Sequence, residues 1–322
     1  MKALKSSICV AVTAIALSLS LVAPSCAGDD EAAPLIRQMK ELYRAGKYVE
    51  ALPLAQKSLA LREKEFGPDD ANVAMPLNDL GTIHYNLGQY AIAEPFYKRS
   101  LAIRENTLGP DDVEVAMVLN NLGDLYRAEE RYAEAESFLK RSIAIGEKTL
   151  GPDNPSIVLA LGNLGAAYSN QGRYDQAEAI FTRALAIFEK AHGTNDPEAT
   201  VLMNNLADTY IQRKRYTDAE RLLKRSMALT EKAFGTDHPD VAQALNNLAE
   251  LYSRQGRNAD AERLFKRSVA TFERTLGPNH PDLAGVLENL AGFYKDQGRY
   301  ADAQLAIKRS LAIRGKSGSK PI

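Results

Sequence analysis

Residues 245–252 read Leu-Asn-Asn-Leu-Ala-Glu-Leu-Tyr, and closely related octapeptides recur along the chain. The Leu-Gly or Leu-Ala pair at the centre returns at steps of 42 residues, and no insertion disturbs the phase. A fixed period of this length predicts that identical structural units stack on one another in the same way. The leucines in phase are Leu80, Leu122, Leu164, Leu206, Leu248 and Leu290.

A second set of positions keeps the same period. An alanine stands in phase in all seven units, and a tyrosine precedes it by three residues in every unit except one, where Asn258 replaces it. An invariant alanine predicts a close approach of two helices, because a larger side chain would overpack the contact. The alanines are Ala51, Ala93, Ala135, Ala177, Ala219, Ala261 and Ala303.

Within each unit the apolar residues follow a helical period. Val118, Leu122, Leu125 and Tyr126 lie at i, i+4, i+7 and i+8, and a second apolar series begins at Ala135. Each unit is therefore predicted to be a helix hairpin, with a first helix near 16 residues and a second near 18. The sequence predicts an all-α fold, a solenoid of about seven such hairpins.

The connections carry helix-ending and helix-starting residues. Gln-Gly-Arg at 171–173, 255–257 and 297–299 separates the two helices of a unit, with Gly just after the first helix. The longer connections, such as Gly-Pro-Asp-Asp, end one unit with Gly and start the next with a capping Asp or Asn. Pro239 and Pro281 fit the first turn of the following helix.

These motifs resemble the tetratricopeptide repeat, and the 42-residue length resembles the kinesin light chain subtype. The similarity covers residues 33–314 and rests also on Gly235-Thr-Asp-His-Pro-Asp-Val-Ala242. It implies a right-handed superhelical solenoid whose concave groove binds a protein or peptide partner. No heptad coiled coil precedes the repeats, so transport by a motor is not implied. The resemblance implies instead an exported bacterial protein built from the same repeat.

The chain of 322 residues carries 40 basic and 41 acidic residues, which excludes a dominant basic surface for nucleic acid. With only two cysteines it can build neither a disulfide framework nor a zinc cluster. Gly-rich phosphate loops, His-Glu-x-x-His pairs and Gly-x-Ser-x-Gly motifs are absent from the sequence. We therefore expect no cofactor, no metal and no catalytic residues.

Three segments are expected: a signal peptide at 1–27, the repeats at 28–314 and a disordered polar tail at 315–322. Lys2 and Lys5 precede an apolar stretch of about 15 residues, which is short for a membrane span of roughly 20. Ser25-Cys26-Ala27 then supplies small residues for cleavage. The predicted location is periplasmic or secreted, without a membrane span after cleavage. An uncleaved anchor, and a lipidated Cys26 in a weak lipobox, remain as alternatives.

Other polar residues have bland explanations. His238 and His280 occupy the same phase beside a helix start and, like His192, are expected to be turn residues rather than metal ligands. His84 replaces a repeat tyrosine and is expected to pack in the core. Pairs such as Asp111-Asp112 are expected to cap helices, because they lack the alternating ligands of a calcium loop. A Lys-Arg row along the second helices, beginning at Lys98-Arg99, is expected on a solvated outer face.

Asparagine in the middle of the first helices is the feature least easily explained, because asparagine is a mediocre helix former. One alternative is an internal ladder, in which each amide is satisfied by the neighbouring hairpin. The other, which the resemblance implies, is a groove in which the amides hold the backbone of an extended peptide. Groove residues such as Arg127, Arg254 and Lys295 would then favour acidic segments. The asparagines are Asn121, Asn163, Asn205, Asn247 and Asn289.

Three functions are compatible with this sequence. A non-catalytic scaffold of the cell envelope that binds a protein or peptide is favoured. A structural or assembly component of an envelope complex, possibly a lipoprotein, is the alternative. An enzyme is disfavoured, because the periodic sequence shows no clustered acid–base constellation. The partner, the oligomeric state and the pathway stay open.

Overall fold

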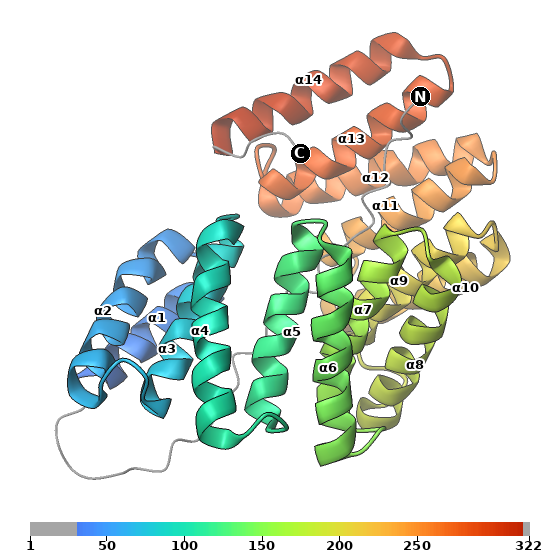
Figure 1. The fold of residues 1–322 in the computed structure, drawn as a ribbon. Helices are drawn as coiled ribbons and strands as arrows, with labels where there is room; N and C mark the ends of the chain where they lie inside the picture. Colours follow the sequence, from blue (N-terminus) through green and yellow to red (C-terminus); the bar gives the residue numbers. More distant parts are fainter. Residues whose placement is uncertain (1–30, 318–322) are drawn as a thin grey trace. The chain divides into compact units, whose positions relative to one another are not determined.

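The computed structural model describes residues 31–317, and within that range the chain is helical, with no strand. The described residues form fourteen α-helices. The helices follow one another as antiparallel pairs (Figure 1). The all-α fold predicted from the 42-residue period is confirmed. The helices are α1 (Ala32–Arg44), α2 (Tyr48–Phe66), α3 (Ala71–Asn86), α4 (Tyr90–Leu108), α5 (Val113–Ala128), α6 (Tyr132–Leu150), α7 (Val158–Asn170), α8 (Tyr174–His192), α9 (Ala199–Gln212), α10 (Tyr216–Phe234), α11 (Pro239–Arg254), α12 (Asn258–Leu276), α13 (Pro281–Asp296) and α14 (Tyr300–Ser317), with a 3-10 turn, η1 (Pro155–Ile157), before α7.

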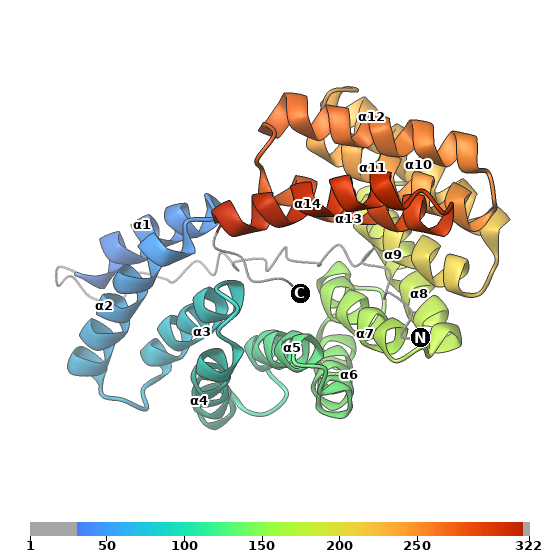
Figure 2. The same ribbon diagram turned by 90° about the horizontal axis from the view of Figure 1, so that it is seen from above.

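The helices form two compact units, which divide between residues 171 and 172. The N-terminal unit contains α1 to α7, and the C-terminal unit contains α8 to α14. Within each unit every helix packs on the next, and first helices of successive hairpins also touch, as α3 touches α5 and α9 touches α11. Figure 2, seen from above, shows the same succession of pairs. This consecutive packing of helix pairs is typical of a repeat solenoid.

The helix lengths follow from the capping residues. The odd-numbered helices have 13 to 16 residues and the even-numbered ones 18 or 19, as predicted. Asp112 Oδ1 accepts a hydrogen bond from the backbone N–H of Glu114 at 2.7 Å and caps α5. At α11 and α13 the cap is instead a histidine, since His238 and His280 accept from the backbone through Nδ1. The predicted Asp or Asn cap is therefore wrong for these two helices.

The turn inside each hairpin needs a residue with positive φ. Gly172 (φ 73°), Gly256 (74°) and Gly298 (71°) supply it as predicted, because glycine has no Cβ to clash in the left-handed region. In two hairpins the chain adopts the same conformation without glycine, at Glu130 (φ 59°) and Lys214 (φ 60°). These two turns are consequently strained.

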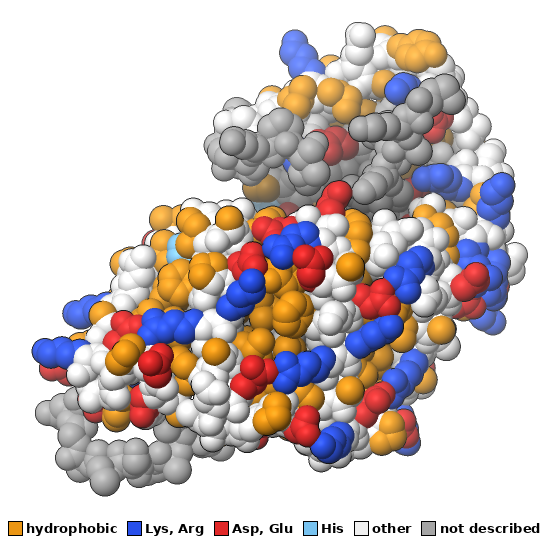
Figure 3. All heavy atoms as spheres, in the orientation of Figure 1, with side chains coloured by type: hydrophobic (Ala, Val, Ile, Leu, Met, Phe, Trp, Pro, Cys, Tyr) orange, Lys and Arg blue, Asp and Glu red, His pale blue; other side chains and the backbone are white. Residues whose placement is uncertain are grey.

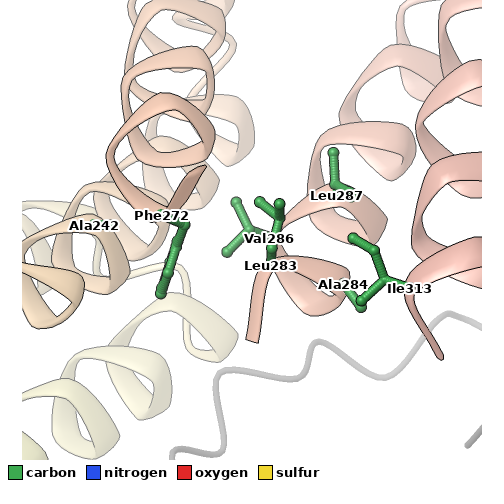
Figure 4. Packing of buried hydrophobic residues seen from close by; sticks show 7 residues of the cluster. All are labelled: Ala242, Phe272, Leu283, Ala284, Val286, Leu287 and Ile313. Atoms are coloured by element: carbon green, nitrogen blue, oxygen red, sulfur yellow. The ribbon is translucent and has the colours of Figure 1, made fainter. Parts of the chain in front are cut away.

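Close helix contacts account for the invariant small residues. Six of the seven phased alanines, Ala303 excepted, are fully buried, which confirms the predicted close approach. A Cβ added to Gly123 would lie 2.4 Å from Leu139 Cγ, so the second helix leaves no room for alanine there. Between hairpins the core is apolar. Figure 4 shows Phe272 of α12 facing Leu283 and Val286 of α13.

At the ends of the chain the structure bears on only part of the prediction. Helix α14 continues through residues 315–317, which the sequence assigned to the tail. The predicted signal peptide, Cys26 and residues 318–322 lie outside the described residues. Within 31–317, no helix is both long enough and apolar enough to cross a membrane.

Candidate functional site

The five predicted asparagines lie near the middle of α5 and α7 in the N-terminal unit and of α9, α11 and α13 in the C-terminal unit. Within each unit these first helices touch one another, as α5 touches α7 and α11 touches both α9 and α13. Four of them are buried, with Asn205 and Asn247 only 6% and 0% exposed, and Asn289 is half-buried. Burial of a polar group is costly unless it is hydrogen-bonded, so the partner of each amide decides its role.

In the N-terminal unit the asparagines pair with one another. Asn121 Nδ2 donates to Asn78 Oδ1 at 2.9 Å, and Asn163 Nδ2 donates to Asn120 Oδ1 at 3.0 Å. Each bond joins two first helices and spans 43 residues of sequence. The geometry is the one that the internal-ladder alternative expects. Each amide also keeps a second N–H, so a role for Asn121 and Asn163 in holding a peptide stays a prediction.

A narrow crevice lies beside these bonds. It is lined by Tyr85, Tyr97, Asn120, Asn121, Asp124, Leu159 and Asn163. The Tyr85 hydroxyl donates to Asp124 Oδ2 at 2.7 Å. Burial, followed by the negative charge of Asp124, raises the pKa of Tyr85 well above its ordinary value. This crevice therefore presents a neutral hydroxyl, amide groups and one carboxylate.

In the C-terminal unit the same pattern is incomplete. Asn289 Nδ2 reaches Asn246 Oδ1 at 3.3 Å, but the bond expected between Asn247 Nδ2 and Asn204 Oδ1 is not made. Both of those atoms are buried without a hydrogen-bond partner among the described residues, and so is Asn205 Nδ2. Helices α9 and α11 thus carry two unsatisfied amide donors.

Carboxylates accompany these donors one helical turn further on. Asp208 follows Asn205 by three residues on α9, and Glu250 follows Asn247 by three on α11. Burial, followed by the negative charge of Glu250, raises the pKa of Asp208 to about 6. Gln212 Nε2 donates to Asp208 Oδ1 at 3.3 Å. The neighbourhood of the unsatisfied amides is therefore acidic rather than basic.

The three predicted basic residues do not come together. Arg127 binds Asp124 Oδ1 through Nε at 2.9 Å and Nη2 at 2.6 Å, on its own helix. Arg254 approaches Glu250 at 3.5 Å. Lys295 lies at the end of α13 and lines a hollow with residues of α14. The expected preference for acidic segments has no support from two arginines that already face carboxylates.

Sequence reasoning missed a second polar series, which joins successive repeats on their outer side. Tyr126 donates its hydroxyl to Glu94 at 2.8 Å, and Arg131 binds the same carboxylate at 3.2 Å while its guanidinium lies 4.1 Å from the Tyr126 ring centroid. Tyr252, Arg257 and Glu220 repeat this arrangement. The 42-residue recurrence of the glutamate was the signal that could have revealed it.

The Lys-Arg row of the second helices is occupied by ion pairs. Arg99 binds Glu63 at 2.6 Å, and Arg141 binds Glu105 at 2.6 Å. Each ion pair joins the second helices of two successive repeats. Lys98 and Lys140 pair with Glu94 and Glu136 one turn earlier on their own helices. Figure 3 shows acidic and basic side chains interspersed over α4, α5 and α6. The predicted solvated outer face agrees with this arrangement.

No group of three or more His, Cys, Asp or Glu residues in 31–317 is arranged to hold a metal ion. His84 is buried and stacks on Phe96 with ring centroids 5.5 Å apart, as expected for a core residue. His238 and His280 cap helices, and Asp70 and Asp112 do the same.

The sequence matches the family model described as tetratricopeptide repeat over residues 41–106, 72–148, 114–190, 197–274 and 240–316. Comparison with curated proteins gives no match. Among solved structures, the chain is similar to the nearly identical TPR-like repeats of a putative kinesin light chain from Podosopora anserina. That similarity has 25% identity and a TM-score of 0.53, over 65% of this chain and 97% of the other.

Two further solved structures show the same fold at lower identity. The apo form of RapI is 16% identical with a TM-score of 0.67, over 89% of this chain and 99% of that one. PilW, a type IV pilus biogenesis factor, is 20% identical with a TM-score of 0.55, over 81% and 100%.

Proposed function

Because the chain belongs to the tetratricopeptide repeat family, whose fold generally serves as a non-catalytic scaffold for protein interactions, we propose that it binds an extended peptide segment of a partner protein. The binding groove is the face formed by the first helices. The observation that carries the proposal is the pair of buried, unsatisfied amide donors of Asn205 and Asn247.

An unsatisfied buried donor costs about 1–3 kcal/mol relative to one that is hydrogen-bonded. A ligand carbonyl that meets these amides after their side chains turn towards the groove would remove that cost, so the two amides favour the bound state over the free state. Peptide backbone offers one carbonyl per residue whatever its sequence. Asparagines on stacked helices are therefore suited to hold an extended backbone, while neighbouring side chains select the sequence.

The remaining groove residues complete the proposal. Asn289 of α13 adds a further amide in the C-terminal unit, and Asn121 and Asn163 offer a corresponding pair within the N-terminal unit, each through the N–H that is not bonded to its asparagine partner. Of the predicted basic groove residues, Arg254 and Lys295 belong to the C-terminal unit and Arg127 to the N-terminal unit. Asp208 and Glu250 follow Asn205 and Asn247 by three residues on the same helices and would disfavour acidic ligand residues at that point.

The finer location also belongs to the proposal. Residues 1–27 have the composition of a signal peptide, which supports a bacterial protein exported to the periplasm or beyond. In the alternative function, Cys26 is lipidated and the chain is a structural or assembly component of an envelope complex. The mature N-terminus distinguishes the two, since signal cleavage leaves Gly28 and lipidation leaves a modified Cys26.

The test of peptide binding starts from a displayed library of random peptides, selected on purified residues 28–322. Hydrogen–deuterium exchange with an enriched peptide should show protection at α9 and α11, because the peptide covers these helices. Protection confined to even-numbered helices, or no enrichment over an unrelated helical protein, would contradict the groove. The charges of the enriched peptides then show which residues the groove selects.

A further inference from the structure

The last helix, α14, carries an apolar stripe that no described helix of its unit covers. Tyr300, Ile307 and Leu311 are 65%, 40% and 53% exposed. With Gln304 they stand at i, i+4, i+7 and i+11, the spacing at which one helix packs along another. Hydrophobic side chains are visible over α14 in Figure 3. These four residues line an open hollow of about 440 Å³ together with Lys295 of α13 and with Ala303 and Lys308 of α14. We call the surface formed by these seven residues the end face.

The same position is buried in the other repeats. Phe265 stands 42 residues before Ile307 and is only 1% exposed. Within the C-terminal unit α12 packs against α13, whose residues Leu283 and Val286 face Phe272 of α12 (Figure 4). In each preceding repeat the equivalent surface of the second helix is therefore covered by the first helix of the next repeat. The shape of the end face suits a helix.

Its charge differs from the preceding sites. In α4, α6, α10 and α12 a glutamate pairs with the lysine four residues later, as Glu262 pairs with Lys266 at 2.8 Å. The same glutamate accepts the tyrosine hydroxyl of the following repeat, as it does from Tyr294 at 3.4 Å. At the position of this glutamate α14 has Gln304, so Lys308 has no carboxylate four residues before it on the helix. Neither Lys308 nor Lys295 has an ion-pair partner among residues 31–317.

A second copy of this chain is a poor occupant of the end face. The residues of its first repeat in phase with Tyr294 and Arg299 are Leu42 and Lys47, so the tyrosine and arginine of the inter-repeat contact are missing. Lys47 would bring a third ammonium group to Lys295 and Lys308. The chain's own last residues, Gly318-Ser-Lys-Pro-Ile322, include a lysine and no acid. Like charges disfavour both occupants.

We propose that the end face of α13 and α14 docks an acidic amphipathic helix of a partner protein. The apolar stripe of that helix packs between Tyr300 and Leu311, and its carboxylates pair with Lys295 and Lys308. The contact extends the helix stacking of the repeats to a partner and is separate from the groove that contains Asn205.

Two stapled helical peptides test this proposal on residues 28–322. Both carry leucines at i, i+4, i+7 and i+11, and they differ only in having glutamate or lysine at the flanking positions. We expect the glutamate peptide to bind about 2- to 30-fold more tightly, because two exposed ion pairs form. Lys295→Glu together with Lys308→Glu should reverse this preference. Lys266→Glu, in a covered repeat, is the matched control and should leave it unchanged.

Three outcomes would overturn the proposal. One is equal affinity for the two peptides, and another is a preference that survives the double charge reversal. The third is concentration-dependent association of the protein itself that Leu311→Asp abolishes, which would make the occupant a second copy. A groove variant such as Asn205→Ala should not change binding of the stapled peptides, so failure here is distinguishable from failure of the groove.

Discussion

The side-chain amide of Asn121 donates to Oδ1 of Asn78 at 2.9 Å and joins two first helices that lie 43 residues apart in sequence. Asn205 has the same position in its repeat, yet its amide nitrogen is buried without a partner in the described chain. One residue type in one phase therefore joins two first helices in the N-terminal unit and carries an unpartnered amide nitrogen in the C-terminal unit.

We expect different effects on stability from these two asparagines. Asn121→Ala leaves the buried Asn78 oxygen unsatisfied and should lower the free energy of unfolding by about 1–3 kcal/mol. Asn205→Ala removes an amide that has no partner and should change it by no more than about 0.5 kcal/mol or raise it. Urea unfolding followed by circular dichroism measures both. Equal losses in the two variants would contradict the distinction.

The turn at Lys214 offers a stabilising substitution. A non-glycine residue in the left-handed region destabilises the folded state by about 1–2 kcal/mol. Glycine removes this strain but loses more entropy on folding, which offsets up to about 1 kcal/mol of the gain. Lys214→Gly should therefore stabilise by up to about 1 kcal/mol in thermal unfolding. Lys214→Ala is the control, because it keeps the strained φ of 60° and should bring no gain. A gain with alanine would show that charge, not strain, is responsible.

The fold was largely predictable because it depends on local periodicity. Leu122, Ala135 and Tyr132 recur every 42 residues, and helix periodicity together with Gly and Pro at the turns fixes where each hairpin starts and ends. The two histidine caps were missed for a physical reason. A histidine can accept a hydrogen bond through Nδ1 only as a neutral ring in one tautomer, so a histidine in the sequence does not by itself predict a helix cap.

The candidate site was only partly predictable. The asparagines could be located, but their roles depend on distances between neighbouring helices. A bond forms at 2.9 Å between Asn121 and Asn78 and is absent between Asn247 and Asn204, although the sequence places both pairs in the same phase. The sequence shows Gln304 in place of a glutamate, but the consequence for Lys308 becomes visible only from the ion pair between Glu262 and Lys266 in the structure.

Asp208 should make stability depend on pH. Its pKa is raised to about 6 in the folded state, from a reference of 3.8, because burial and Glu250 disfavour the charged carboxylate. The folded state then holds the proton more tightly, so stability is highest below pH 4 and falls as pH rises towards 6 and above. The fall attributable to Asp208 is about 1–3 kcal/mol.

Asp208→Asn tests that assignment, because the amide cannot ionise. Relative to the natural protein, the variant should gain stability between pH 4.5 and pH 7.5 in urea unfolding. Asp79, whose pKa burial also raises to about 6, retains its own contribution, so a residual pH dependence is expected. A constant difference between the two proteins across this range would contradict the assignment.

Processing of the chain is tested by mass spectrometry of the protein recovered from bacteria that express residues 1–322. We expect a mature N-terminus at Gly28 or within a few residues of it, because small residues precede that position. Retention of Met1 would contradict export by signal cleavage. A diacylglyceryl group on Cys26 would favour the alternative function in the envelope.

The central claim is that the amides of Asn205 and Asn247 hold a peptide backbone. Calorimetric titration of the library-selected peptide tests it most directly, with Asn205→Ala/Asn247→Ala against the natural protein and with exposed Asn106→Ala as the control. Two neutral hydrogen bonds of about 0.5–1.5 kcal/mol each predict a loss of about 5- to 150-fold in affinity for the double variant and none for the control. Unchanged affinity in a folded double variant would contradict the account.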